Sequence, residues 1–74
     1  MSKLYSSKEI EWVIKQLGFI IQSQSGSHGK FKNKDGEVVI LPMNKKEMPE
    51  GTFRSILKQA GITKSHFIVY LEEK

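Results

Sequence analysis

The sequence contains no cysteine, so several kinds of chemistry are excluded at the outset. Disulfide bonds, thiol nucleophiles and thiolate metal sites all need that residue. The carboxylates are scattered along the chain, which removes the acidic clusters that hold pairs of catalytic metal ions. The Walker phosphate-binding loop, the dinucleotide-binding glycine fingerprint and the Ser-His-Asp order are missing as well. We therefore expect neither a metal ion nor a cofactor.

Long apolar segments are also missing. The longest apolar run covers residues 38–41, far short of the roughly 20 residues that cross a bilayer. Residues 1–5 hold no apolar stretch of the length that a signal peptide needs. A chain of 74 residues builds one domain with a modest core. The sequence therefore predicts a single cytoplasmic domain over residues 1–74.

Positive charge outweighs negative charge. Twelve lysine and arginine residues oppose eight acidic residues, which gives a formal net charge of +4. No acid occurs between Glu11 and Asp35, a segment that contains four lysines. Positive charge concentrated in this way attracts polyanions, and nucleic acid is the first candidate partner. The alternative is that the lysines only keep the protein soluble.

Residues 5–17 carry the signals of an amphipathic helix. Ser6 and Glu9 have the spacing of a capping box, in which each side chain accepts a hydrogen bond from a backbone N–H at the helix start. Gly18 follows as a stop. One side of this helix is an apolar stripe that consists of Ile10, Val13, Ile14 and Leu17. Trp12 lies off this stripe, either as a partly exposed flank residue or as a partner contact.

Three strands are expected next, over residues 19–25, 28–33 and 37–43. Asp35 and Gly36 favour a two-residue type I′ turn between the last two strands, because both residue types tolerate positive φ. Pro42 has no N–H to donate, so we expect the third strand to lie at an edge of the sheet.

A second helix is expected to begin near Pro49, whose fixed φ suits a first turn, and to end at Gly61. Residues 63–71 favour a short third helix over a strand, since Thr63 is placed as its cap. The predicted fold class is α+β, with the order helix, three-stranded antiparallel sheet, helix, and short C-terminal helix or tail. The apolar side of the second helix is formed by Phe53, Ile56, Leu57 and Ala60.

The third strand is apolar on both of its alternating faces. A sheet that is covered by helices on one side needs only one apolar face. Either the second set of apolar side chains is left for a partner, or the C-terminal tail covers it through Phe67 and Leu71.

The strongest functional signal lies in residues 26–31. Strand alternation places His28, Lys30 and Lys32, together with Lys34, on one face and Phe31 on the other. Histidine is the side chain best suited to proton transfer near neutral pH, and lysines beside it can hold phosphates. The alternative is a strand-end histidine that only hydrogen-bonds a loop or contacts a phosphate.

RNA carries its own nucleophile, the 2′-OH, so a protein can cleave it without a metal ion by moving protons and stabilising charge. In-line cleavage needs a base for the 2′-OH and an acid for the leaving 5′-oxygen. His28 can supply one of these roles, but the only other histidine, His66, lies in the C-terminal tail. A lysine, a water molecule or a group on the RNA is left for the second role.

Four short segments, in this order and spacing, resemble the HicA toxins of bacterial and archaeal HicA/HicB toxin-antitoxin modules. They are Leu17-Gly18-Phe19 at the end of the first helix, Gly26-Ser27-His28 before the second strand, Asp35-Gly36 in the hairpin, and the second-helix segment GTFRSILKQAG from Gly51 to Gly61.

The resemblance implies a fold like the double-stranded RNA-binding domain and a ribosome-independent activity that cleaves mRNA. In that activity the histidine that matches His28 is catalytic. A HicB antitoxin is the implied partner, and it covers this histidine. The resulting complex represses its own operon through the DNA-binding part of the antitoxin, so the toxin contacts DNA only indirectly.

Many members of that family carry a second histidine where this chain has Gly29, and another where it has Asn44. Their absence makes His28 the only imidazole expected near the site. We expect His28 to act as general acid or base, without a metal ion. The expected RNA contacts are Ser27, Lys30, Lys32, Lys45, Lys46, Arg54 and Lys58.

Two other functions are considered. The first is a non-catalytic module that binds double-stranded RNA by the shape of its helix. The second is an antitoxin-like DNA-binding protein, against which the lack of helix-turn-helix spacing argues.

Overall fold

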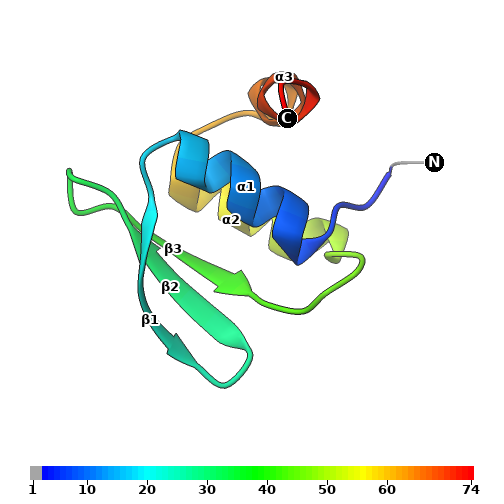
Figure 1. The fold of residues 1–74 in the computed structure, drawn as a ribbon. Helices are drawn as coiled ribbons and strands as arrows, with labels where there is room; N and C mark the ends of the chain where they lie inside the picture. Colours follow the sequence, from blue (N-terminus) through cyan, green and yellow to red (C-terminus); the bar gives the residue numbers. More distant parts are fainter. Residues whose placement is uncertain (1–2) are drawn as a thin grey trace.

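The computed structural model describes residues 3–74, and its first helix, α1, spans Ser7–Gln16 (Figure 1). Residues 1–2, part of the N-terminal segment tested above for a signal peptide, lie outside the described residues. The predicted capping box is confirmed. Ser6 Oγ accepts a hydrogen bond from the Glu9 N–H at 3.1 Å, and Glu9 Oε1 accepts one from the Ser6 N–H at 2.8 Å. Gly18, with φ of 98°, then turns the chain toward the sheet.

The antiparallel sheet has the strand order β1-β2-β3, so β3 is an edge strand, as Pro42 predicted. In the register of β2 and β3, His28 lies opposite Pro42 and Lys30 opposite Ile40. The pairing of β1 with β2 contains an irregularity between Ile21 and Ser23. The three strands are β1 (Ile20–Ser25), β2 (His28–Lys32) and β3 (Val38–Pro42).

The predicted type I′ turn in the second hairpin is wrong. Within the described residues only Asn44 among the non-glycine residues has positive φ, so Asp35 does not adopt the conformation that a type I′ turn needs. Instead, Asn33 and Glu37 close a three-residue loop in which Gly36 alone is left-handed, with φ of 82°. Asn33 Oδ1 accepts hydrogen bonds from the N–H groups of Asp35 and Glu37, which stabilises the wider loop.

Helix α2 (Glu50–Ala60) and helix α3 (Lys64–Glu72) complete the fold. The expected stop of α2 at Gly61 is confirmed, since this residue is left-handed with φ of 76°. The C-terminal tail is a helix, as favoured above, and Thr63 Oγ1 caps it by accepting a hydrogen bond from the His66 N–H at 3.2 Å. The architecture is therefore α+β and compatible with the fold of the double-stranded RNA-binding domain.

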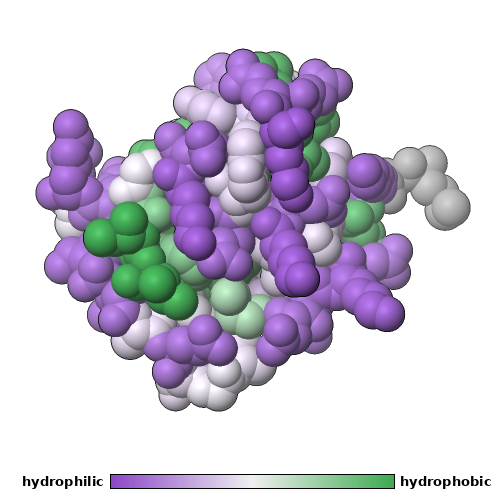
Figure 2. Space-filling view, viewed as in Figure 1, coloured by the Kyte–Doolittle hydropathy of each residue, from purple (hydrophilic) through white to green (hydrophobic). Residues whose placement is uncertain are grey.

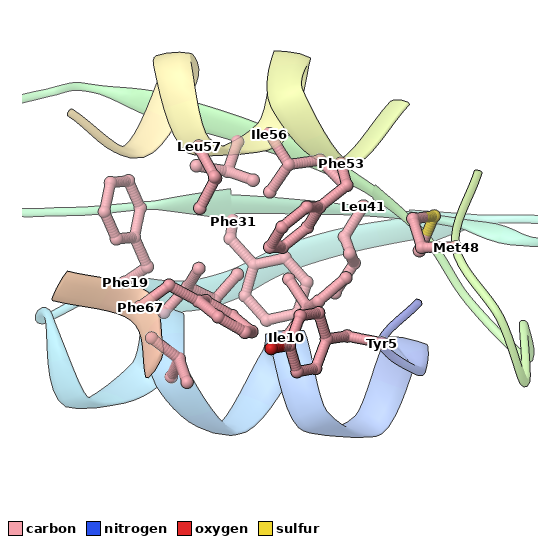
Figure 3. Packing of buried hydrophobic residues seen from close by; sticks show 13 residues of the cluster. Tyr5, Ile10, Phe19, Phe31, Leu41, Met48, Phe53, Ile56, Leu57 and Phe67 are labelled. Atoms are coloured by element: carbon pink, nitrogen blue, oxygen red, sulfur yellow. The ribbon is translucent and has the colours of Figure 1, made fainter. Parts of the chain in front are cut away.

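The core lies between the sheet and the helices: α1 and α2 cover one face of the sheet, and α3 packs beside α1 on the same side (Figure 1). Figure 3 shows the rings of Tyr5, Phe53 and Phe67 directed toward one another. The Phe67 centroid lies 4.9 Å from each of the other two, in edge-to-face geometry. Phe67 thus holds α3 in the helical layer. The C-terminal tail does not cover the second apolar face of β3, so that alternative is wrong.

None of the helices formed by residues 3–74 is long and apolar enough to cross a membrane.

Candidate active site

The face of the sheet that the helices leave uncovered carries three rows of side chains. The register places Ile20, Lys32 and Val38 in the first row and Ser23, Lys30 and Ile40 in the second. The third row, at the end of the sheet, contains Ser25, His28 and Pro42. None of these nine residues is acidic, so the charge of the rows is set by lysine and, when protonated, histidine.

His28 is the first residue of β2, and its side chain is exposed on this face. The backbone next to it is fixed, because the Met43 N–H donates a hydrogen bond to the Ser27 carbonyl at 2.6 Å. Within residues 3–74 the imidazole takes part in no side-chain hydrogen bond or ion pair. Both ring nitrogens are therefore available to a bound molecule.

Lys30 and Lys32 share the face of His28, as strand alternation predicted, while Phe31 is fully buried on the other side. The prediction that Lys34 shares this face is wrong, because β2 ends at Lys32 and Lys34 lies in the hairpin loop. The ion pairs formed among residues 3–74 involve Lys15 and Arg54 but neither Lys30 nor Lys32. The ammonium groups of these two lysines are thus free to hold phosphates along the strand that begins with His28.

Gly29 faces the helical layer rather than the surface that carries His28. A Cβ at this position would lie 3.0 Å from Phe31 Cε1 and 3.2 Å from Met43 Sδ. A histidine here would therefore point away from His28, so the glycine removes no imidazole from the exposed face. Met43 fills the space that a side chain at position 29 would need.

Lys45 and Lys46 lie in the loop between β3 and α2, where they line a hollow of about 390 Å³ beside the start of α1. Asn44, with φ of 65°, belongs to the same hollow. Lys8 of α1 lines it from the opposite side and was missed by the sequence analysis. No local sequence pattern indicates that Lys8 lies near Lys45 and Lys46, because their proximity depends on contacts between α1 and a loop more than 30 residues later.

Arg54 and Lys58 are exposed on α2, in the helical layer and not on the strand face that carries His28. Arg54 Nε lies 3.7 Å from Glu50 Oε2, and this ion pair partly neutralises the charge of Arg54. The structure therefore separates the expected RNA contacts into three groups: Ser27, Lys30 and Lys32 near His28, Lys45 and Lys46 at the adjoining loop, and Arg54 and Lys58 on α2.

His66 is remote from this face. It lines a shallow hollow of about 440 Å³ on α3, together with Ile62, Val69, Tyr70 and Glu73. Residues 3–74 contain no cluster of three or more histidine, cysteine, aspartate or glutamate residues with the geometry of a metal site.

Comparison with known families gives one match. The model of a family described as the HicA toxin of bacterial toxin-antitoxin matches residues 7–62, which is well over half of the chain. The matched region runs from the start of α1 through α2 and includes His28. Among curated proteins, none matches the chain.

Proposed function

Because the chain belongs to the HicA toxin family of toxin-antitoxin systems, we propose that it is a ribosome-independent endoribonuclease that cleaves mRNA with His28 as its catalytic residue. The observation that carries the proposal is the position of His28, exposed at the end of a sheet face that contains two lysines and no acid. An RNA strand on this face meets an imidazole and two phosphate-binding groups together.

The reaction uses the nucleophile that RNA itself supplies. The 2′-oxygen attacks the adjacent phosphorus, the bond from phosphorus to the 5′-oxygen breaks, and a 2′,3′-cyclic phosphate remains. One proton leaves the 2′-OH and one is taken up by the departing 5′-oxygen. His28 performs one of these transfers and water the other, since the three rows offer no second imidazole and no carboxylate.

Lys30 stabilises the transition state in this proposal. It follows His28 by two residues on the same face of β2, so both side chains reach the same stretch of RNA backbone. Negative charge builds on the phosphate oxygens during attack, and an ammonium group beside them lowers the barrier. The reaction needs neither a metal ion nor a cofactor, and its mRNA substrate places the protein in the cytoplasm.

A HicB-type antitoxin is the proposed partner, and the uncovered sheet face is its proposed docking surface. Ile20 and Ile40 expose 62% and 41% of their surface there, next to Lys30 and Lys32. Figure 2 shows a strongly hydrophobic patch where Figure 1 places β1. Apolar side chains flanked by lysines suit a partner segment with apolar and acidic residues. Such a segment excludes RNA from His28.

The decisive experiment compares wild type, His28→Ala and His66→Ala on a long RNA in excess EDTA. We expect wild type and His66→Ala to cleave, and His28→Ala to bind the RNA but lose activity by about 100-fold or more. Cleavage by His28→Ala would overturn the assignment of this residue. A wild-type protein that binds the RNA and leaves it intact would instead be a non-catalytic RNA-binding module.

A further inference from the structure

We propose that the surface between α1 and the β3–α2 loop is a binding channel for single-stranded RNA, with one base stacked on Trp12. This inference rests on the proposed RNA-cleaving function and assigns the substrate path beyond His28.

The channel consists of two adjoining hollows on the exposed side of α1. The first, of about 390 Å³, lies between the start of α1 and residues 43–46. The second, of about 290 Å³, is lined by Lys8, Glu11, Trp12 and Lys15. Lys8 and Glu11 line both hollows, so the two adjoin along the helix.

The channel begins at the end of the sheet where β2 starts with His28. Met43 lines the first hollow, and its N–H is bonded to the carbonyl of Ser27, the residue before His28. The Met43 side chain also packs beside Gly29, the residue after His28. Met43 lies on the helical side of the sheet and His28 on the uncovered face, so in this proposal a strand that is cleaved at His28 turns around this end of the sheet, past Met43, to enter the channel.

Four lysines line the two hollows, and each can contact a phosphate: Lys8, Lys15, Lys45 and Lys46. The carboxylate of Glu11 is the acid of this lining, and its Oε2 is paired with Lys15 Nζ at 3.1 Å. It suits the amino group of a base rather than a phosphate. The start of α1 does not itself provide the anion site, because the N–H groups of Ser7 and Glu9 are bonded to Lys45 and Ser6.

Trp12 is the aromatic residue of this surface. It is half-buried, since it packs against the hydrophobic core and also lines the second hollow. A base stacks on an indole only when it is free of its neighbours in a duplex. The combination of phosphate-binding lysines and one stacking aromatic therefore points to a single strand rather than to a double helix.

Trp12 is the only tryptophan of the chain, so its fluorescence reports on this channel alone. The experiment titrates the protein with a single-stranded RNA that is 2′-O-methylated throughout and cannot be cleaved. We expect saturable quenching of Trp12 by the single strand and little change with a duplex of the same sequence. Equal quenching by the duplex, or unchanged emission at saturating single strand, would overturn the channel.

Variants identify the contacts by the binding of a dye-labelled RNA. Lys8→Ala and Lys45→Ala should each lower the slope of log affinity against log salt by about 0.7, whereas Lys74→Ala, which removes the same charge beyond the end of α3, should not. Trp12→Leu should weaken binding roughly tenfold, and Trp12→Phe, which keeps a stacking ring, should restore most of it. Equal effects of Lys8→Ala and Lys74→Ala would contradict the proposal.

The experiments distinguish failure of the proposed channel from failure of the proposed nuclease activity. Cleavage of RNA with no response of Trp12 overturns the channel and leaves the nuclease intact. Quenching of Trp12 without cleavage of unmodified RNA overturns the nuclease and leaves the channel. Quenching by an acidic antitoxin but by no RNA would mean that this surface binds protein instead.

Discussion

The backbone N–H of Ile40 in β3 donates a hydrogen bond to Oε1 of Gln59 in α2, at 2.9 Å. This contact satisfies a donor on the outer edge of the sheet, where a second chain would otherwise add a strand. Nearby, Pro42 has no N–H, and its carbonyl accepts a hydrogen bond from Ser7 Oγ at 2.6 Å. The β3 edge is thus closed by side chains from two helices, while the opposite edge strand, β1, is interrupted by the irregularity after Ile21.

Gln59→Ala should therefore destabilise the protein by about 1 kcal/mol, since the Ile40 N–H loses its partner within the protein. Gln59→Glu keeps an acceptor at the same position and should therefore lose less stability than Gln59→Ala. Urea unfolding of the three proteins gives the comparison. Identical midpoints for Gln59→Ala and wild type would mean that water replaces the amide at no cost.

The proposed chemistry predicts a strict need for the 2′-OH at the cleaved bond. A substrate with one 2′-deoxy nucleotide 5′ to its main cleavage site should not be cut there, while cleavage elsewhere continues. The products from unmodified RNA should end in a 2′,3′-cyclic phosphate or its 3′-phosphate hydrolysis product, with a 5′-OH on the other fragment. Mass spectrometry of the fragments identifies these ends, and a 5′-phosphate would rule out attack by the 2′-oxygen.

Loss of apolar surface from the uncovered sheet face should weaken antitoxin binding much more than it destabilises the fold. Ile40→Thr keeps a β-branched side chain and removes apolar surface from an exposed position. We expect affinity for the antitoxin to fall by about tenfold, which corresponds to roughly 1.4 kcal/mol, with little change in the unfolding midpoint. Calorimetric titration measures the affinity, and an unchanged value would exclude this face as the docking surface.

Gly29 should tolerate substitution poorly, although it lies in a strand. Its added Cβ would press on the Phe31 ring and on Met43 Sδ, and overpacking of this kind costs about 1–3 kcal/mol. Gly51→Ala is the matched control, because a Cβ at that helical position meets nothing within 4 Å. We expect Gly29→Ala to lower the thermal midpoint and Gly51→Ala to preserve or raise it. A double variant with Met43→Ala should recover part of the loss at Gly29, and additivity would contradict the coupling.

Local signals were enough to predict most of the elements. The capping box at Ser6 and Glu9, and the stop at Gly61, each act within a few residues, so they identify helix ends without knowledge of the fold. The second hairpin was predicted wrongly because Asn33, outside the Asp-Gly pair, accepts two backbone hydrogen bonds and selects a wider loop.

The site was only partly predictable. Strand alternation placed His28 and Lys30 on one face because it depends on neighbouring residues alone. Whether the C-terminal tail covers that face could not be inferred from the sequence, because the answer depends on whether Phe67 packs on the strands or on the helices. The channel was missed for a similar reason, since Lys8 and Lys45 meet only through tertiary contacts.

Ser7 of α1 should fix the position of the β3–α2 loop, and thereby of the lysines that line the channel. It is 3% exposed, and its Oγ donates to the Pro42 carbonyl while accepting from the Lys45 N–H at 2.9 Å. Ser7→Ala leaves both backbone groups without this partner, which costs about 1–3 kcal/mol. Amide exchange at Lys45 should accelerate, and affinity for single-stranded RNA should fall, because the loop no longer fixes its lysines beside Lys8. Ser65→Ala, an exposed serine in α3, controls for the loss of a hydroxyl. If Ser7→Ala lost stability without a change in Lys45 exchange, the serine would stabilise α1 and not the loop.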